Sequence, residues 1–451
     1  MTSTTTVRAD EGLVQALSAT SLAVILTLVL TTPFVEMSGL VAPADRVYRL
    51  YAYGLVLLLQ LALVAARGWQ QSLRIVATPA AAVLVWFCLS LIWAQHFELA
   101  GKRLFLVSLI YLTSLGAVCD LGYQRSLAIV RPLLALALVV NIVVVFAFPS
   151  VGTQTWNQYD LWRGIMAHKN FAGLLAAITF LVFAFDGKKV PPPLRLVVQL
   201  ASLALLYQSW SRTALISALI AGAIGLGIGL AKPSERSSLL SRQSALTKGA
   251  WACLAVVLVA ISVLTIERDF ILSFTEDASA LSLRTSIWRP LIQFYLDHPV
   301  LGSGYGAYWD ATVNAESTSA YSTQKWLQEV DQGHNGYLDL LVQTGLPGLA
   351  LALGAAFVWP MSRFSTITER LPQRAALIFA LVSFVLIENF AESSLFADDA
   401  IANFFLFFAL AQIHRFELRS DTKPARRRRK RRSAEGSLLA DHNAPPAHRR
   451  L

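Results

Sequence analysis

The sequence predicts an all-α polytopic membrane protein with about twelve transmembrane helices and one large outward-facing loop. Of its 451 residues, 55% are hydrophobic and only 15% are charged, and the mean hydropathy is +0.54. These values lie far outside the range of soluble globular proteins. Long apolar runs alternate with short loops along most of the chain, and roughly 20 such residues cross a bilayer as a helix.

Twelve apolar runs reach or approach that length. The first is expected to remain as an uncleaved span, because no small-residue cleavage site follows it. The seventh is the shortest. The runs are Leu13–Phe34, Val47–Ala66, Ala77–Ala94, Arg103–Val118, Arg125–Phe148, Asn170–Phe185, Leu194–Tyr207, Arg212–Leu230, Gly249–Ile266, Gly336–Trp359, Arg374–Phe390 and Asp399–Phe416.

The positive charges in the short loops predict the orientation of the spans. Lys and Arg are enriched in cytoplasmic loops of membrane proteins. Twelve spans place both termini on one side, and that side receives most of the basic residues, including Lys188, Lys189, Arg370 and Arg374. Both termini are therefore expected to be cytoplasmic, and the long polar segment Glu267–Asn335 is expected to face outward.

These predictions divide the chain into four parts. Residues 1–266 form a membrane domain of nine spans, 267–335 form the outward loop, 336–418 form three further spans, and 419–451 form a basic tail that is expected to be disordered. The tail contains the run Arg426–Arg432. On a membrane protein we interpret such a run as an anchor for anionic lipid headgroups and not as a nucleic-acid site.

Charges on the outward side that topology does not require are candidate functional residues. Arg163, His168 and Lys169 precede the sixth span, where they can hold an anion at a helix N-terminus. The structural alternative is an interfacial belt with Asn170 as the helix cap. Arg212 lies in a very short outer turn with serine neighbours that can bind further phosphate oxygens; its alternative is a guanidinium that reaches to lipid phosphate.

The outward loop contains a further pair of arginines. Ile287, Leu291 and Phe294 recur at helical spacing, which predicts an amphipathic helix lying on the membrane. Arg284 stands at the start of that helix, and Arg289 is a weaker candidate within it. A guanidinium binds two phosphate oxygens at once, which Lys cannot do. Surface cations on an interfacial helix are the structural alternative.

His334 ends the outward loop, in a turn flanked by glycines at the start of the tenth span. A helix N-terminus disfavours the protonated ring, so a neutral imidazole that can accept a proton is expected there. A capping or headgroup-contacting histidine is the structural alternative. Glu392, in an acidic outer loop with Glu388, is a further candidate site residue.

Two other kinds of site are not supported by the sequence. The run Gly302-Ser-Gly304-Tyr-Gly306 lacks the preceding strand and the following helix of a nucleotide-binding loop, so a tight turn after His298-Pro299 is expected instead. No His, Asp or Glu cluster has metal-ligand spacing. We therefore expect neither a bound metal nor a cofactor.

The order of these motifs resembles the O-antigen ligase and polysaccharide polymerase family of bacterial inner membranes. The motifs are Ser-Arg212-Thr after a short outer turn, Arg284-Thr-Ser-Ile-Trp, His298-Pro-Val-Leu-Gly-Ser-Gly, and Gly-His334-Asn-Gly-Tyr followed by Gly-Leu-Pro-Gly. The stretch Gly-Ile-Met-Ala-His168-Lys-Asn is similar to the exopolysaccharide polymerase branch. The motifs extend from about Arg163 to Leu349.

The resemblance implies a GT-C-like membrane glycosyltransferase. Its donor would be a glycan on undecaprenyl pyrophosphate, and its acceptor a sugar hydroxyl on a second repeat unit or on lipid A core. In this family the arginines that match Arg212 and Arg284 contact the pyrophosphate, and the histidine that matches His334 activates the acceptor. Polymerase and ligase remain open, as does the oligomeric state.

Two other classes remain as alternatives. A twelve-span transporter of lipid-linked glycans would show two related halves with matching broken helices, and no such symmetry is visible in the sequence. A structural partner in a polysaccharide export complex has no need for an outward set of two arginines and a histidine. The sequence therefore favours an enzyme.

Overall fold

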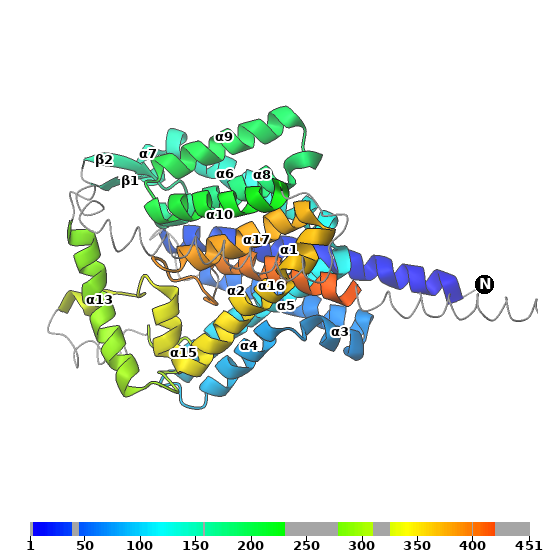
Figure 1. Cartoon of the computed structure of the whole chain (residues 1–451), viewed down its shortest axis with the longest axis horizontal. Helices are drawn as coiled ribbons and strands as arrows, with labels where there is room; N and C mark the ends of the chain where they lie inside the picture. Colours follow the sequence, from blue (N-terminus) through cyan, green and yellow to red (C-terminus); the bar gives the residue numbers. More distant parts are fainter. Residues whose placement is uncertain are drawn as a thin grey trace, which may run out of the picture.

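The computed structural model describes residues 3–37, 45–156, 158–230, 278–309, 325–398 and 400–419. The predicted span Gly249–Ile266, residues 267–277 and 310–324 of the outward loop, and the tail Arg426–Arg432 lie outside these ranges. The described residues are almost entirely helical, with one short antiparallel hairpin (Figure 1).

The elements follow in chain order. They are α1 (Ser3–Met37), α2 (Asp45–Arg67), α3 (Trp69–Val76), α4 (Pro79–Ser90), α5 (Phe97–Leu121), α6 (Tyr123–Ala147), α7 (Pro149–Gly152), β1 (Thr153–Trp156), β2 (Tyr159–Trp162), α8 (Lys169–Asp186), η1 (Gly187–Lys189), α9 (Pro192–Gln208), α10 (Arg212–Leu230), α13 (Ala278–Asp297), η2 (Lys325–Glu329), α15 (Gly336–Leu353), the π-helical turn η3 (Gly354–Val358), α16 (Trp359–Arg370), α17 (Pro372–Glu388) and a last helix, Ile401–Arg419.

Seven of the described helical segments are long and apolar enough to cross a membrane, which confirms a polytopic α-helical protein. An eighth is added if α2 and α3, which meet at 119°, are one broken span. The predicted number of twelve is not confirmed. Three predicted spans correspond to shorter helices: α4 has 12 residues, and α9 and α17 have 17 each.

The burial pattern is typical of a membrane protein, because large apolar side chains are exposed on its outer surface. Large apolar side chains are exposed along α9 and α10, such as Leu200 and Leu219. Contiguous exposed apolar surface of this kind is explained by contact with lipid. The last helix is the opposite case, because its phenylalanines are buried on all sides among other helices: Phe404, Phe405, Phe407 and Phe408.

The bundle has two ends with different contents. The hairpin β1–β2, α13 and the start of α15 gather at one end, and α3 lies toward the other (Figure 1). The central helix α17 runs between the two ends and packs extensively on α10. Its 17 residues separate its ends by about 25 Å at the usual helical rise of ~1.5 Å per residue. The first end is the one that the charge bias predicts to be periplasmic.

Helix α15 is broken at Gly345, whose φ of 65° only glycine adopts readily. The backbone groups next to the break bond elsewhere: the Trp86 indole donates to the Thr344 carbonyl at 2.9 Å, and the Leu346 amide donates to the Pro299 carbonyl at 2.9 Å. Irregular backbone at membrane depth requires such partners. Residues 299–309 form consecutive turns against this break, which confirms the predicted turn after His298-Pro299.

Helix α13 is present as predicted, but its environment differs from the prediction. The Ile287, Leu291 and Phe294 side chains are buried in a cluster with Tyr308 and Val342. The prediction that this stripe lies on the membrane is therefore wrong, because the stripe packs against α15 and the turns before it. The helix also begins at Ala278, so Arg284 lies in its second turn.

Candidate functional site

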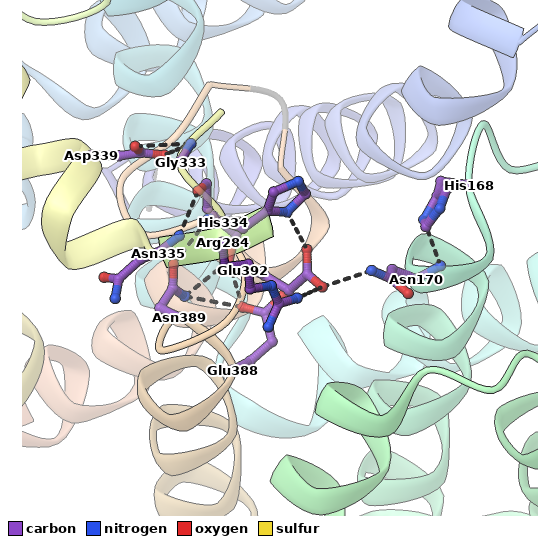
Figure 2. Close-up of polar contacts among 12 residues, drawn as sticks. His168, Asn170, Arg284, Gly333, His334, Asn335, Asp339, Glu388, Asn389 and Glu392 are labelled. Carbon is purple, nitrogen blue, oxygen red and sulfur yellow. Dashed lines mark hydrogen bonds and ion pairs between the residues drawn. The ribbon is translucent and has the colours of Figure 1, made fainter. Parts of the chain in front are cut away.

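Glu392 is the centre of a polar cluster at the predicted periplasmic end of the bundle. It lies in the loop that follows α17. The Asn170 side-chain amide donates to its Oε1 at 2.7 Å, Arg284 Nη2 is 3.9 Å from the same oxygen, and His334 Nδ1 is 3.8 Å from Oε2 (Figure 2). One carboxylate thus joins α8, α13 and the start of α15, which are far apart in the sequence.

His334 occupies the turn that the sequence predicts, directly before the helix cap of α15. Asn335 is that cap, and its side chain accepts from the Leu338 amide at 3.1 Å. His334 itself has a φ of 49°, in the left-handed region that is sparsely populated for residues other than glycine. Backbone strain of this kind is concentrated at functional sites.

Three further hydrogen bonds fix the His334 turn. The Gly336 amide donates to the backbone carbonyls of Asn389 at 3.0 Å and Glu392 at 2.8 Å. The Asn335 amide donates to Ser393 Oγ at 3.2 Å. The start of α15 and the loop after α17 are therefore held together as one unit, which keeps the His334 ring facing the Glu392 carboxylate.

The His334 ring has one buried and one accessible side. Its Nδ1 is buried and lacks a hydrogen-bond partner, whereas the side chain as a whole is 32% exposed. Closing the 3.8 Å gap to Glu392 by roughly 0.6–1 Å would make a normal hydrogen bond. A proton on Nδ1 directed at the carboxylate leaves the other ring nitrogen as an acceptor, which is the arrangement of a histidine base oriented by an acid.

Arg284 is brought to this turn by the packing of α13. The Trp288 indole, one helical turn after Arg284, donates to the Gly333 carbonyl at 2.8 Å. The Gly333 amide donates in turn to both carboxylate oxygens of Asp339, at 3.1 and 3.2 Å, and Asp339 is only 5% exposed. Residues four apart share a helix face, so Arg284 lies beside His334 and Glu392.

His168 is the N-cap of α8, because its Nδ1 accepts from the Asn170 amide at 3.2 Å. The alternative of Asn170 as the cap is wrong, and the Asn170 side chain reaches Glu392 instead. Burial is the main cause that lowers the pKa of His168; Glu392 opposes this, and Lys169, His334 and Arg163 lower the pKa further. His168 is thus neutral at pH 7 and caps the helix, while its neighbours supply positive charge.

Arg212 approaches the cluster through the tight turn between α9 and α10. A Cβ on Gly173 would lie 2.5 Å from the Ser211 Cβ, so this glycine allows the turn to press against the first part of α8. Arg212 is exposed at the start of α10, and both Arg212 and Glu392 are close enough to act on the charge of Lys169.

The remaining candidates are placed differently. Arg163 follows β2, where its Nε donates to the Val151 carbonyl at 2.9 Å, and its charge acts on His168. Arg289 is exposed on α13, and within the described residues it makes no hydrogen bond or ion pair with the Glu392 cluster. All eight candidates therefore lie toward one end of the molecule, but Arg289 makes no contact with the cluster in the part of the chain that the structure describes.

The charge of the cluster is strongly positive. Arg284 and Lys169 are close to the partly accessible carboxylate of Glu392, and Arg163 and Arg212 act on the charges of His168 and Lys169. A neighbouring carboxylate, Glu388, is 3% exposed and accepts instead from Ser394 Oγ at 2.8 Å and from the Asn389 amide at 3.1 Å. Such an excess of basic groups attracts a polyanion, and guanidinium pairs match phosphate oxygens.

Sequence reasoning missed the residues that support the site. Asn170 was interpreted as a cap, and Asn389 and Ser393 were not considered at all. The available signal was the acidic pair Glu388 and Glu392 at the end of an apolar run, on the side where carboxylates are not needed for topology. No group of three His, Cys, Asp or Glu in the described part of the chain is arranged to hold a metal ion.

Comparison with known proteins gives two matches. The family model described as O-antigen ligase matches residues 197–353, which contain Arg212, Arg284 and His334. The exopolysaccharide production protein ExoQ of Rhizobium meliloti (strain 1021) is 26% identical over 166 residues, covering 36% of this chain and 35% of that protein. The chain thus matches about a third of the length of this relative. These matches support the resemblance to the O-antigen ligase and polysaccharide polymerase family that the motifs indicate.

Proposed function

We propose that this protein is a membrane glycosyltransferase of the bacterial inner membrane that acts at the periplasmic face. Its donor is a glycan linked to undecaprenyl pyrophosphate, and its acceptor is a sugar hydroxyl. The reaction we favour is polymerisation of exopolysaccharide or O-antigen repeat units, and the comparison with an exopolysaccharide production protein supports this choice.

The observation that carries the proposal is the convergence on Glu392. Asn170, Arg284 and His334 come from three distant segments and contact one carboxylate, with Arg163, Lys169 and Arg212 nearby. An apolar bundle surrounds this group. A basic cluster with an acid-oriented histidine at a membrane surface fits a lipid-linked pyrophosphate and a hydroxyl that must lose its proton.

The reaction divides the work among these groups. The acceptor hydroxyl oxygen forms a bond to the anomeric carbon of the donor, and the bond between that carbon and the pyrophosphate oxygen breaks. The hydroxyl proton passes to the accessible nitrogen of His334, and Glu392 stabilises the resulting imidazolium. Arg212 and Arg284 neutralise the negative charge that develops on undecaprenyl pyrophosphate as it leaves. Attack opposite the leaving group inverts the anomeric centre.

These roles predict an enzyme that needs no divalent cation, because the guanidinium groups supply the positive charge that metal ions supply in metal-dependent enzymes. Purified enzyme is expected to keep its activity in excess chelator. Complete inhibition that Mg²⁺ or Mn²⁺ reverses would contradict the assignment of the arginines as the main charge stabilisers. His334→Ala is expected to abolish nearly all transfer while binding of the lipid-linked donor persists.

Ligation of finished polymer to lipid A core is the second candidate function, and the description of the matching family model favours it. Deletion of the gene followed by electrophoresis of surface polysaccharide separates the two. Single repeats still attached to lipid A core indicate a polymerase, and polymer that stays on undecaprenyl pyrophosphate indicates a ligase. Single repeats that stay on undecaprenyl pyrophosphate at the cytoplasmic face would contradict both functions and indicate a transporter.

A further inference from the structure

A second basic site lies at the opposite end of the bundle from Glu392. A cavity of about 330 Å³ opens between the start of α6, the junction of α16 and α17, and the end of the last helix. Four arginines line it: Arg370, Arg374, Arg415 and Arg419. Arg374 lies in the first turn of α17 and Glu392 follows its end, so the length of α17 separates this cavity from the proposed active site.

Aromatic rings and backbone groups hold three of these guanidinium groups in place. Arg374 lies over the Tyr123 ring at 4.9 Å, and Arg370 lies over the Phe416 ring at 5.7 Å. Arg415 Nε donates to the Cys119 carbonyl at 3.0 Å. These contacts orient the side chains, but none of them supplies a negative charge.

Other arginines at the same end of the bundle differ from those of the cavity because they have acidic partners. Arg67 pairs with Asp120 and Arg131 pairs with Asp186, and all four side chains are largely buried. Within the described residues, by contrast, no carboxylate forms a direct ion pair with Arg370, Arg374 or Arg415. Asp186 and Asp120, which pair with other arginines, act on Arg374 and Arg415 only from a longer distance. Clustered cations in a partly enclosed space repel each other unless an anion joins them.

We propose that this cavity binds a phosphate group, and that the phosphate belongs to the headgroup of an anionic phospholipid in the adjoining leaflet. Arginine forks match phosphate oxygens in geometry and charge. The remaining wall includes the apolar side chains Ile367, Leu371, Ile378 and Phe416. They suit the glycerol and upper acyl chain of a lipid and give no advantage to free phosphate. Basic pockets between helices on the cytoplasmic side are recognised lipid sites.

The bound lipid would stabilise the fold at the end of the bundle opposite the proposed active site. The cavity walls come from α6, α16, α17 and the last helix, so one headgroup joins four helices. A ligand that binds only the folded state raises its stability according to its concentration and affinity. This inference does not depend on the proposed glycosyl transfer, because it concerns a different end of the molecule.

The test uses delipidated full-length protein in detergent. Phosphatidylglycerol and phosphatidylcholine are each added, and inorganic phosphate is added alone in a third arm. Native mass spectrometry measures bound lipid, and the midpoint of thermal unfolding measures stabilisation. We expect phosphatidylglycerol to bind at least tenfold more tightly than phosphatidylcholine and to raise the midpoint, with inorganic phosphate competing only at high concentration.

Two sets of variants locate the binding. The triple variant Arg370→Gln, Arg374→Gln, Arg415→Gln removes the guanidinium groups, and Arg370→Gln with Arg374→Gln alone keeps the Arg415 backbone bond in case the triple variant does not fold. The control is Arg125→Gln, Lys188→Gln, Lys189→Gln, which removes equal charge from side chains outside the cavity at the same end.

The expected result is a loss of phosphatidylglycerol affinity of at least tenfold in the cavity variants and little change in the control. Strong binding of inorganic phosphate that the same variants abolish would retain the phosphate site but reject the lipid as its source. Equal losses in the cavity and control variants, or equal binding of phosphatidylglycerol and phosphatidylcholine, would overturn the proposal.

Discussion

Replacing Glu392 by Gln tests whether this carboxylate acts through His334. Glutamine keeps an oxygen that can accept from Asn170, as Glu392 Oε1 does at 2.7 Å, so the local packing is preserved. The charge that faces His334 Nδ1 at 3.8 Å is lost. Because the imidazolium forms only when the acceptor hydroxyl gives up its proton, the loss should appear in the transition state and thus in kcat.

The size of the effect follows from the distance. Two unit charges 3.8 Å apart interact by about 4 kcal/mol at an effective dielectric constant of ~20. The His334 side chain is about one-third exposed, so solvent screening reduces this value, and we expect about 1–2 kcal/mol. That corresponds to a kcat roughly 5- to 30-fold lower. His334→Ala removes the base itself and should cost about 10²–10⁴-fold.

The assay is a double-mutant cycle on purified enzyme with a lipid-linked donor. If Glu392 acts through His334, Glu392→Gln should cost less than about threefold once His334 is already Ala, because both changes then affect one unit. Asp331→Asn serves as the matched control, since Asp331 is exposed three residues before His334 and should keep wild-type activity. Fully additive losses in the cycle would refute the positioning role of Glu392.

Three further outcomes are expected. Arg212→Lys and Arg284→Lys should each lose most activity at equal membrane abundance although they keep the charge, because a point charge does not replace a bidentate guanidinium. The control Arg289→Lys, outside the cluster, should keep near wild-type activity. A wild-type polymer yield in all three variants would remove the arginines from the site. Burial holds the pKa of His168 below its usual 6.5, so unfolding takes up a proton there and the free energy of unfolding should fall as the pH drops below about 6.5. Between pH 7.5 and 5, the midpoint of thermal unfolding should depend less steeply on pH in His168→Gln than in the wild type. An unchanged pH dependence in this variant would contradict the assignment. In a background without native cysteines, a cysteine at Asp331 should react with a membrane-impermeant reagent in cells with a permeabilised outer membrane, whereas one at Lys188 should not; the reverse labelling would invert the orientation.

The sequence by itself determined the class of the protein and most of the candidate residues. Apolar runs of membrane length identify a polytopic helical protein because lipid leaves backbone groups no partner outside the helix. Charges that topology does not need, such as Arg212 and Arg284, stand out because they are costly at a membrane. The glycine-flanked His334 is visible for a similar local reason: a turn must precede the helix.

The tertiary structure alone decided how these residues act together. Glu392 meets Asn170, Arg284 and His334 only because α8, α13 and α15 converge at the end of α17. No local pattern encodes contacts between residues that are 222, 108 and 58 positions apart. The tertiary structure also decided the environment of α13, because its apolar stripe could pack against a membrane or against other helices equally well. Periodicity shows which face of a helix is apolar, whereas packing decides what covers that face.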